Sequence, residues 1–231
     1  MAGQRPSRWP ELFDLAVKIL SHAAASTGLE PVWSFGGGTA LMLQINHRES
    51  HDVDLFVDDP QLLPFLNPET QEVPLERRPT DYQTDGTRVL KLTYQELGEI
   101  DFICAAHVLN EPTRVRNVRG HKVALETPAE IIAKKIYYRG TSFQPRDMLD
   151  LAAVVEHYGA DYAIAALSQC GPERCLSALG TIERAKPEFV TSILVQLMLR
   201  QSTRHLVDTA QEISRSTLLR AVRATGSSGS A

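Results

Sequence analysis

The spacing of apolar and polar residues along the chain changes near residue 126. Before that point, short runs rich in β-branched and aromatic residues are separated by turn residues, which is typical of strands. We expect strands at 31–35, 52–57, 88–94 and 99–104, and a further β pair or ribbon within 114–126. A helical period precedes them over 9–27 and ends at Gly28, while the proline-containing stretch 58–81 is expected to be a helix-and-loop connection.

After residue 126 the apolar positions follow a helical period almost to the end of the chain. We therefore predict an α+β protein with a mixed β-sheet and flanking helices, followed by a C-terminal helical domain. The expected divisions are 1–126 for the sheet domain, 127–225 for the helical domain and 226–231, with the sequence GSSGSA, for a flexible tail.

Composition and charge exclude several classes of protein. The chain has 231 residues, 43% apolar residues and a formal net charge of −4, which is ordinary for a globular domain and unlike a nucleic-acid coat. No stretch approaches the ~20 consecutive apolar residues of a membrane span, and the first residues lack the apolar core of a secretion signal. Three cysteines without neighbouring zinc ligands indicate reduced thiols, so we expect a cytoplasmic protein with no membrane partner.

Three consecutive glycines follow the first predicted strand. Gly36, Gly37 and Gly38 allow a tight turn and close approach of a ligand to the backbone, and Thr39 is expected to start a short helix. A helix N-terminus favours phosphate, so Gly37, Gly38 and Thr39 are candidate phosphate-binding residues. The stretch is neither a Walker A loop nor a dinucleotide fingerprint, because the required Gly-Lys-Ser/Thr and third glycine are absent. A glycine turn without a ligand is the alternative.

Two aspartates lie inside the next apolar run. Asp52 and Asp54 are two residues apart on a predicted strand, so they share a face and would repel unless a cation joins them. Asp101, in the middle of the second arm of a predicted hairpin, is the expected third ligand, in preference to Glu99 at the strand start. Carboxylates of this kind suit Mg²⁺ or Mn²⁺. The alternative for Asp101 is a simple pair with Lys91 across the hairpin.

The first predicted helix after residue 126 has an N-terminal capping box, with Thr127 at the N-cap and Glu130 three residues later. Lys134 lies four residues after Glu130, so an ordinary surface ion pair accounts for it. Lys135 and Arg139 are stacked on another flank and repel unless an anion lies between them. We assign both to the nucleotide phosphates, with a solvated basic flank as the alternative.

The following helix carries two aspartates beside its core stripe. Asp147 is predicted at the edge of the stripe, where it could complement the helix N-terminus. Asp150 lies further round and is expected to pair with Arg146 at the surface.

Three blocks of the sequence together resemble the AbiEii/AbiGii-type nucleotidyltransferases, the toxins of type IV toxin–antitoxin systems. The first block is GGGTALMLQINHRESHDVDLF, in which the family pattern falls on Gly37, Gly38, Thr39, His47, Arg48, Ser50, Asp52, Asp54, Leu55 and Phe56. The others are AEIIAKKIYYRG (129–140) and PRDMLDLAAV (145–154). The first block is specific, whereas the two helical blocks gain weight from their order.

The resemblance implies a DNA polymerase β-like fold and transfer of a nucleoside monophosphate from an NTP, with Asp52, Asp54, Asp101, Lys135 and Asp147 as the catalytic set. It suggests RNA, in particular the tRNA 3′ end, as the acceptor and a cognate antitoxin as a partner. Asp147 would activate the acceptor or orient Lys135, although Asp150 could carry this acidic role instead.

Several basic residues have more than one interpretation. Arg48 could brace a carboxylate or touch the triphosphate, and Ser50 could bond a phosphate, whereas His47 and His51 are expected to be structural or exposed. The basic run RVRNVRGHK (114–122) could be a track for an RNA backbone or a solvated ribbon. The remaining alternatives are transfer to a small molecule or a protein hydroxyl, and a nucleotide-binding module that has lost catalysis.

Overall fold

The computed structural model describes residues 6–227, which form two compact units. Unit 1 contains the chain up to Ala40 together with Ser50–Ala106 and Thr113–Glu126, and unit 2 contains Leu41–Glu49, His107–Pro112 and the chain from Thr127 onward. The chain passes between the units more than once, so neither is one continuous stretch. The assignment of a catalytic role to residues 1–126 and a separate helical domain to 127–225 stays a prediction.

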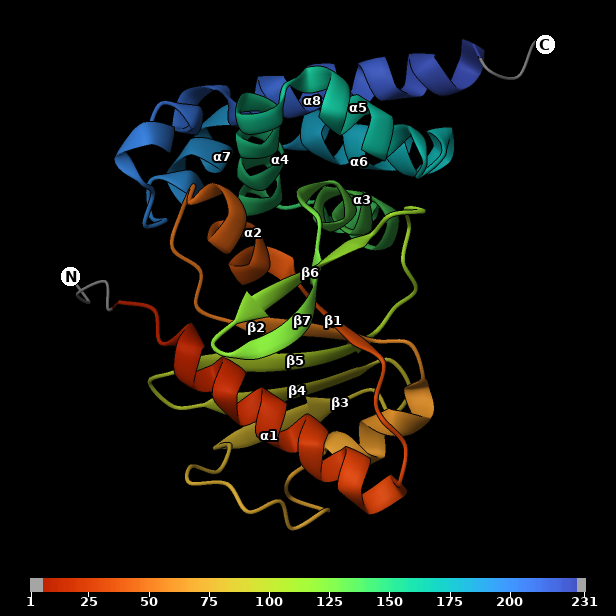
Figure 1. The fold of residues 1–231 in the computed structure, drawn as a ribbon. Helices are drawn as coiled ribbons and strands as arrows, with labels where there is room; N and C mark the ends of the chain where they lie inside the picture. The colour runs from red at the N-terminus through yellow and green to blue at the C-terminus, as the bar shows by residue number, and fades with distance from the viewer. Residues whose placement is uncertain (1–5, 228–231) are drawn as a thin grey trace. The chain divides into compact units, whose positions relative to one another are not determined.

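Unit 1 is built on a seven-stranded mixed sheet with the strand order β3-β4-β5-β2-β1-β7-β6 (Figure 1). The strands are β1 (Trp33–Gly36), β2 (Val53–Val57), β3 (Asp81–Thr84), β4 (Val89–Tyr94), β5 (Gly98–Cys104), β6 (Thr113–Val118) and β7 (His121–Glu126). Two parallel pairings, of β2 with β5 and of β1 with β7, join strands that are distant along the chain. The predicted α+β class with a mixed sheet is confirmed.

Helix α1 (Trp9–Thr27) crosses the sheet of unit 1 and has the predicted bounds (Figure 1). A proline in its first turn suits the start of a helix, and Gly28 ends it in the left-handed region with φ 71°. Its buried stripe includes Leu12, Phe13 and Ile19, and the helix contacts β2 and β5. Since successive strand residues alternate, one face of those strands buries apolar side chains and the other is left for polar ones.

Two local features of unit 1 differ from the prediction. Strand β3 was not expected, because Asp81–Thr84 has no apolar alternation and all four residues are exposed at the sheet edge. Helix α2 (Gly37–Ile45) begins two residues before Thr39, directly after β1, and its residues from Leu41 belong to unit 2. The predicted connection after β2 does contain a helical turn, η1 (Pro60–Leu66).

Unit 2 is helical. Its elements after α2 are α3 (Pro128–Arg139), η2 (Gly140–Ser142), α4 (Pro145–Tyr158), α5 (Ala160–Ser168), α6 (Pro172–Arg184), α7 (Pro187–Leu194), η3 (Gln201–Thr203) and α8 (Leu206–Ser227). Helix α8 packs against α4, α5, α6 and α7, and α4 is buried continuously from Asp147 to Val154. A helix buried all round lies in the centre of its unit rather than at the surface.

The C-terminal end of the chain differs from the prediction, and the three cysteines form no disulfide. Helix α8 continues to Ser227, so the start of the predicted tail is helical, and residues 228–231 lie outside the described residues. Cys104, Cys170 and Cys175 are free thiols, and the last two are buried. None of the helices within residues 6–227 is long and apolar enough to cross a membrane.

Candidate active site

Asp54 and Asp101 lie side by side in the sheet of unit 1. They are register partners across the parallel strands β2 and β5, and Lys91 is the register partner of Asp101 on β4. Neighbouring strands are about 4.8 Å apart and register partners face the same way, so the three side chains project from one face. The buried residues Leu55 and Phe102 occupy the face that α1 covers. The predicted facing of Asp54 and Asp101 is thereby explained by the pleat.

Asp52 joins the same group from the residue just before β2. Its Oδ1 accepts a hydrogen bond from the backbone N–H of Glu99 at 3.1 Å, which ties it to the start of β5. Its carbonyl oxygen accepts a hydrogen bond from the hydroxyl of Thr39, a residue with no exposed surface. We call Asp52, Asp54, Glu99, Asp101 and Lys91 the acidic cluster.

Lys91 is the cation within the acidic cluster. Its Nζ donates a hydrogen bond to Glu99 and lies 3.2 Å from Oδ1 of Asp101, so it forms ion pairs with both. Burial alone would lower the pKa of Lys91, but Glu99 and Asp101 outweigh it and the pKa is raised. Burial raises the pKa of Asp101, and the attraction of Lys91 opposes this shift without cancelling it. The alternative in which Asp101 pairs with Lys91 is therefore present in the structure.

The glycine turn is shaped around carboxylates. Gly37 has φ +67°, and a Cβ there would lie 1.9 Å from Oδ2 of Asp54. A Cβ on Gly36 would lie 2.2 Å from Oε2 of Glu126, whose other oxygen accepts a hydrogen bond from the Ser34 hydroxyl at 2.8 Å. Close approach to the glycine backbone was predicted for a ligand, and in the structure Asp54 and Glu126 make that approach. The role of Gly38 stays a prediction.

The hydroxyl of Thr39 forms a hydrogen bond within unit 1. The hydroxyl donates to the Asp52 carbonyl and so holds the start of β2 against the start of α2. A hydroxyl that already donates inside the protein cannot donate its single proton to a phosphate as well. What Thr39 can still offer a phosphate is its backbone N–H in the first turn of α2.

The acidic cluster offers donors of the type that a hard divalent cation prefers. All its potential ligands are carboxylate oxygens, the donors preferred by Mg²⁺ and Mn²⁺. Oδ1 of Asp101 is buried and accepts no hydrogen bond from any residue in the described part of the chain. A buried oxygen in this condition is costly unless a cation lies near it, as Lys91 does. Asp52, Asp54 and Asp101 are the residues that would hold the ion.

A second group of predicted residues gathers inside unit 2. Oδ1 of Asp150 lies 2.8 Å from both Nε2 of His47 and Nε of Arg48, and its Oδ2 lies 3.1 Å from Nη2 of Arg48 and 2.9 Å from Nζ of Lys135. Lys135 also donates to Oδ1 of Asp147 at 2.6 Å. We call His47, Arg48, Lys135, Asp147 and Asp150 the buried charge network, because none is more than 9% exposed.

The backbone around His47 and Arg48 is held by the chain near residue 200. Glu49 N–H donates to the Met198 carbonyl at 2.8 Å, and Arg200 N–H donates to the His47 carbonyl at 3.1 Å. The sequence block that follows α2 is thereby fastened to a segment about 150 residues away, which no local pattern predicts.

The pKa values of the network follow from its pairing. Burial alone would raise the pKa values of Asp150 and Asp147, but Arg48 and Lys135 hold Asp150 well below its ordinary value, and Lys135 and Arg139 lower Asp147. Burial would lower the pKa of Lys135, yet the two aspartates raise it. Burial lowers the pKa of His47, so at neutral pH it is uncharged and Nε2 carries the proton donated to Asp150.

Two predicted surface positions on α3 and α4 are wrong. Asp150 was expected at the surface beside Arg146, but it has no exposed surface and binds His47, Arg48 and Lys135. Lys134 does lie 4.0 Å from Glu130, but the pair is buried and not at the surface. Both errors come from treating α3 and α4 as amphipathic surface helices when nearly every side of each is covered.

The anion between Lys135 and Arg139 comes from the protein itself. Asp147 accepts the hydrogen bond of Lys135 and is stabilised by the charge of Arg139, which is half-buried. The repulsion that suggested a phosphate between the two cations is thus relieved by a carboxylate. Their contact with an NTP remains a prediction.

The predicted capping box at the start of α3 is confirmed for Thr127 but not for the Glu130 side chain. The Thr127 hydroxyl accepts the backbone N–H of Glu130 at 3.2 Å, as predicted. The Glu130 carboxylate, however, accepts the N–H groups of Val108 and Leu109, both at 2.9 Å. It therefore fastens the segment before β6 instead of the helix start.

Ser50 and His51 lie outside these two groups, whereas His47 belongs to the buried charge network. Ser50 is buried in unit 1, where its carbonyl accepts a hydrogen bond from the Ser7 hydroxyl. His51 is partly exposed, and His47 is structural as expected. The sequence-based prediction gave Lys91 and Glu99 only secondary roles and placed Asp150 at the surface. The positions of Lys91 and Asp101 opposite each other in the predicted hairpin were the signal that could have identified Lys91 as part of the site.

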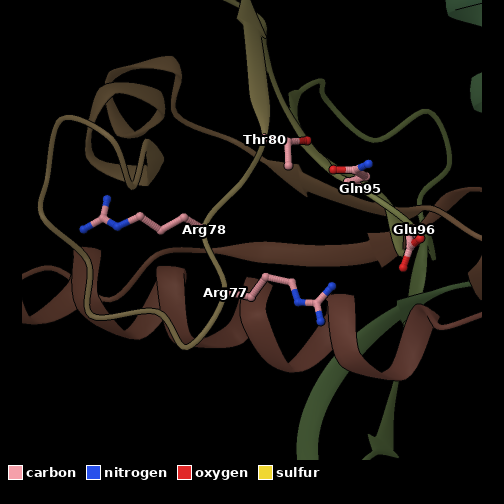
Figure 2. Close-up of a pocket in the computed structure, with 5 residues that line it drawn as sticks. All are labelled: Arg77, Arg78, Thr80, Gln95 and Glu96. Carbon is pink, nitrogen blue, oxygen red and sulfur yellow. The ribbon is translucent and has the colours of Figure 1, made fainter.

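A shallow pocket of about 310 Å³ in unit 1 is lined by none of the predicted site residues. Its lining is Arg77, Arg78, Thr80, Gln95 and Glu96 (Figure 2). The side chains of Arg77 and Arg78 extend in opposite directions in Figure 2, so they do not converge on one ligand. This pocket offers no constellation suited to catalysis.

The sequence matches a known protein family, and the fold is similar to that of a solved structure. The family described as "Nucleotidyl transferase AbiEii toxin, Type IV TA system" matches residues 18–219. No curated protein matches the sequence. MenT4, a nucleotidyltransferase toxin from Mycobacterium tuberculosis, is similar in structure with a TM-score of 0.50 and 17% identity, over 92% of this chain and 83% of that one.

A protein of H. pylori assigned as a nucleotidyltransferase is also similar, with a TM-score of 0.49 and 14% identity over 96% of this chain and 98% of that one. At 17% identity MenT4 bears on the fold alone, whereas the family match spans most of the sequence. This chain therefore belongs to the AbiEii family of type IV toxin–antitoxin systems and is a nucleotidyltransferase.

Proposed function

We propose that this nucleotidyltransferase moves a nucleoside monophosphate from an NTP to a hydroxyl of RNA, with the tRNA 3′ end as the favoured acceptor, and releases pyrophosphate. Mg²⁺ or Mn²⁺ bound by Asp52, Asp54 and Asp101 is proposed as the cofactor. The observation that carries the proposal is the register of Asp54 and Asp101 on parallel strands, beside a glycine turn that opens a helix.

The bound cation would neutralise charge on the transferred phosphoryl group and polarise the reacting oxygens. The protein's part is to hold the carboxylates rigidly: Thr39 and the Glu99 backbone fix Asp52, and Gly37 leaves room for Asp54. The N–H groups in the first turn of α2 are proposed to bind the phosphates, since a helix N-terminus attracts anions.

Lys135, Arg139 and Arg48 are proposed as further contacts of the triphosphate, and Asp147 as the residue that orients Lys135. The 2.6 Å hydrogen bond from Lys135 to Asp147 supports the orienting role. A lysine fixed in this way loses little conformational freedom on binding a phosphate, which favours precise positioning.

The β6–β7 hairpin supports an RNA acceptor. Arg114, Arg116 and Lys122 are exposed and form no ion pair within residues 6–227, whereas Arg119 is bound to Asp14 at 2.8 and 2.6 Å. Unpaired cations at a sheet edge are available to phosphates of an RNA backbone. Activity on NTP and RNA would place the protein in the cytoplasm, and the family implies a cognate antitoxin.

The proposal is tested by incubating the protein with each radiolabelled NTP, Mg²⁺ and total cell RNA. We expect label in RNA with the wild type and none with Asp54→Asn. Label in protein or in small molecules, with RNA unlabelled, would reassign the acceptor to those classes. NTP binding without any labelled product would favour a binding module.

The hairpin is tested separately by RNA binding at several salt concentrations. Replacing Arg116 by Gln should lower the salt dependence by about one phosphate contact, whereas the same change at Arg119, already paired with Asp14, should alter it less. Equal effects at the two positions would contradict the proposed track.

A further inference from the structure

The feature that the proposed reaction leaves unexplained is the lysine among the carboxylates. Lys91 lies on β4 directly opposite Asp101, and its side chain is 27% exposed. Its Nζ is 3.2 Å from the Asp101 oxygen that accepts no hydrogen bond from the described residues, and it donates its hydrogen bond to Glu99. Lys91 therefore lies between a proposed metal ligand and a carboxylate outside that ligand set.

An ammonium group and a divalent cation cannot share Asp101 without strong repulsion. The repulsion between two cations this close falls off only slowly in a partly buried site, and it is twice as large for a divalent ion as for a monovalent one. Either Lys91 prevents the metal from binding or it must leave Asp101 when the metal enters. Glu99 is placed to receive it, because the hydrogen bond between them already exists.

We infer that Lys91 is an internal counter-ion that holds Asp101 when no metal is bound, and that divalent-ion binding requires Lys91 to give up Asp101 and remain on Glu99. This inference rests on the metal site of the proposed function. Lys91 and Glu99 are then positioning residues: together they set how tightly the ion is held without contacting the reacting atoms.

The inference predicts opposite effects from the two partners. Lys91→Met keeps the apolar stem of the side chain but removes its charge, so the competitor is lost and Mn²⁺ should bind on the order of 10-fold more tightly. Glu99→Gln removes the group that receives Lys91, so the ammonium stays on Asp101 and Mn²⁺ should bind more weakly. Mn²⁺ binding is read directly from the loss of its free electron paramagnetic resonance signal, without NTP or RNA.

The double variant separates this role of Glu99 from direct coordination. If Glu99 acts only through Lys91, Glu99→Gln should have no effect on Mn²⁺ affinity once Lys91 is Met. If Glu99 were itself a ligand, Glu99→Gln would weaken binding in both backgrounds, which would overturn the inference. Lys18→Met is the matched control, because Lys18 pairs with Glu76 at 2.7 Å at the surface and should leave the affinity unchanged.

The remaining outcomes are equally decisive. Unchanged or weaker Mn²⁺ binding by a folded Lys91→Met variant would overturn the inference while leaving the metal site intact. Mn²⁺ binding by neither the wild type nor Lys91→Met would overturn both the inference and the proposed site. Should the Lys91→Met variant fail to fold, Lys91→Gln removes the same charge with a polar side chain and should also bind Mn²⁺ more tightly.

Discussion

The acidic cluster of unit 1 and the buried charge network of unit 2 both contain adjacent aspartates, but the ion pairs described for them differ. In the acidic cluster, Lys91 is the cation that contacts Glu99 and Asp101, while Asp52 and Asp54 lie nearby. In the buried charge network, Arg48 and Lys135 offset Asp147 and Asp150, with neutral His47 as a further donor.

Solvent access accounts for the difference. Asp147 and Asp150 have no exposed surface, and charges without water must be paired inside the protein because desolvation is expensive. The side chains of Lys91, Glu99 and Asp101 keep 27%, 35% and 16% of their surface exposed. Water and ions can reach these three side chains. A buried, paired network is suited to holding its side chains in place, whereas carboxylates that ions can reach are suited to receiving a cation.

The largest expected effect is on activity in the acidic cluster. Asp54→Asn should lower nucleotidyl transfer by on the order of 10³-fold, because an amide oxygen cannot supply the charge that holds the cation. Folding stability should be unchanged or slightly higher, since one of several repelling charges is removed. Rates of NTP incorporation and thermal melting curves measure the two effects.

Asp81→Asn is the matched control, because Asp81 is an exposed aspartate on the edge strand β3 of the same sheet. Its activity should equal that of the wild type. A full rate for Asp54→Asn, or a large loss of stability, would show that the acidic cluster is structural like its counterpart in unit 2.

The second effect is on stability in the buried charge network. Asp150→Ala should lower the free energy of unfolding by about 3 kcal/mol, because Arg48 is left buried without its carboxylate while Lys135 keeps Asp147. Urea denaturation measures this quantity. Asp161→Ala, which breaks the exposed pair with Arg220, should cost less than about 1 kcal/mol.

If Asp150→Ala were as mild as Asp161→Ala, the buried network would contribute little to folding, and the contrast between the two regions would fail. If it were stable but inactive, Asp150 would carry the acidic catalytic role that the sequence left open between it and Asp147.

The strands were predictable because their signal is local. The alternation of Val53, Asp54 and Leu55 identifies both the strand and its polar face, and it needs no knowledge of neighbours. The pairing of Asp54 with Asp101 followed from chemistry, since clustered carboxylates require a partner. Strand β3 was missed because an exposed edge strand lacks the apolar alternation that marks the others.

The buried network was less predictable because its partners are far apart in the sequence. Asp150 meets His47 and Arg48 about 100 residues away, and the helix carrying it is covered on every side. On a helix assumed to be amphipathic, an aspartate off the apolar stripe is assigned to the surface. Only the packing of α4 inside unit 2 reveals that this position is central.

A smaller effect is expected at the glycine turn. Gly37→Ala should lower stability by about 2 kcal/mol, combining the left-handed backbone at φ +67° with a Cβ that would displace the Asp54 carboxylate. Gly28→Ala is the matched control, because Gly28 has φ 71° and ψ 10° in the left-handed region but nothing within 4 Å of the added Cβ, so it should cost only about 1 kcal/mol of strain.

The difference between these two variants isolates the contact with Asp54, and it should be accompanied by lower activity for Gly37→Ala alone. Equal costs and equal activities would mean that Asp54 moves aside freely and does not need its observed position.

The smallest effect appears only when pH is lowered. Lys135 and Arg139 hold the pKa of Asp147 below its ordinary value of 3.8, although burial opposes them. A carboxyl group with a lowered pKa in the folded state stabilises the protein above the unfolded value, and this contribution disappears as pH falls through the folded pKa. The stability difference between wild type and Asp147→Asn should therefore be constant from pH 7 to pH 5 and shrink below about pH 4.

The exposed Asp161→Asn variant should show a much smaller difference throughout, and urea titrations at each pH provide the comparison. A stability difference for Asp147→Asn that stays the same into the acid range would mean that Asp147 acts through packing and its hydrogen bonds, so the buried network would owe less to charge balance than its geometry indicates.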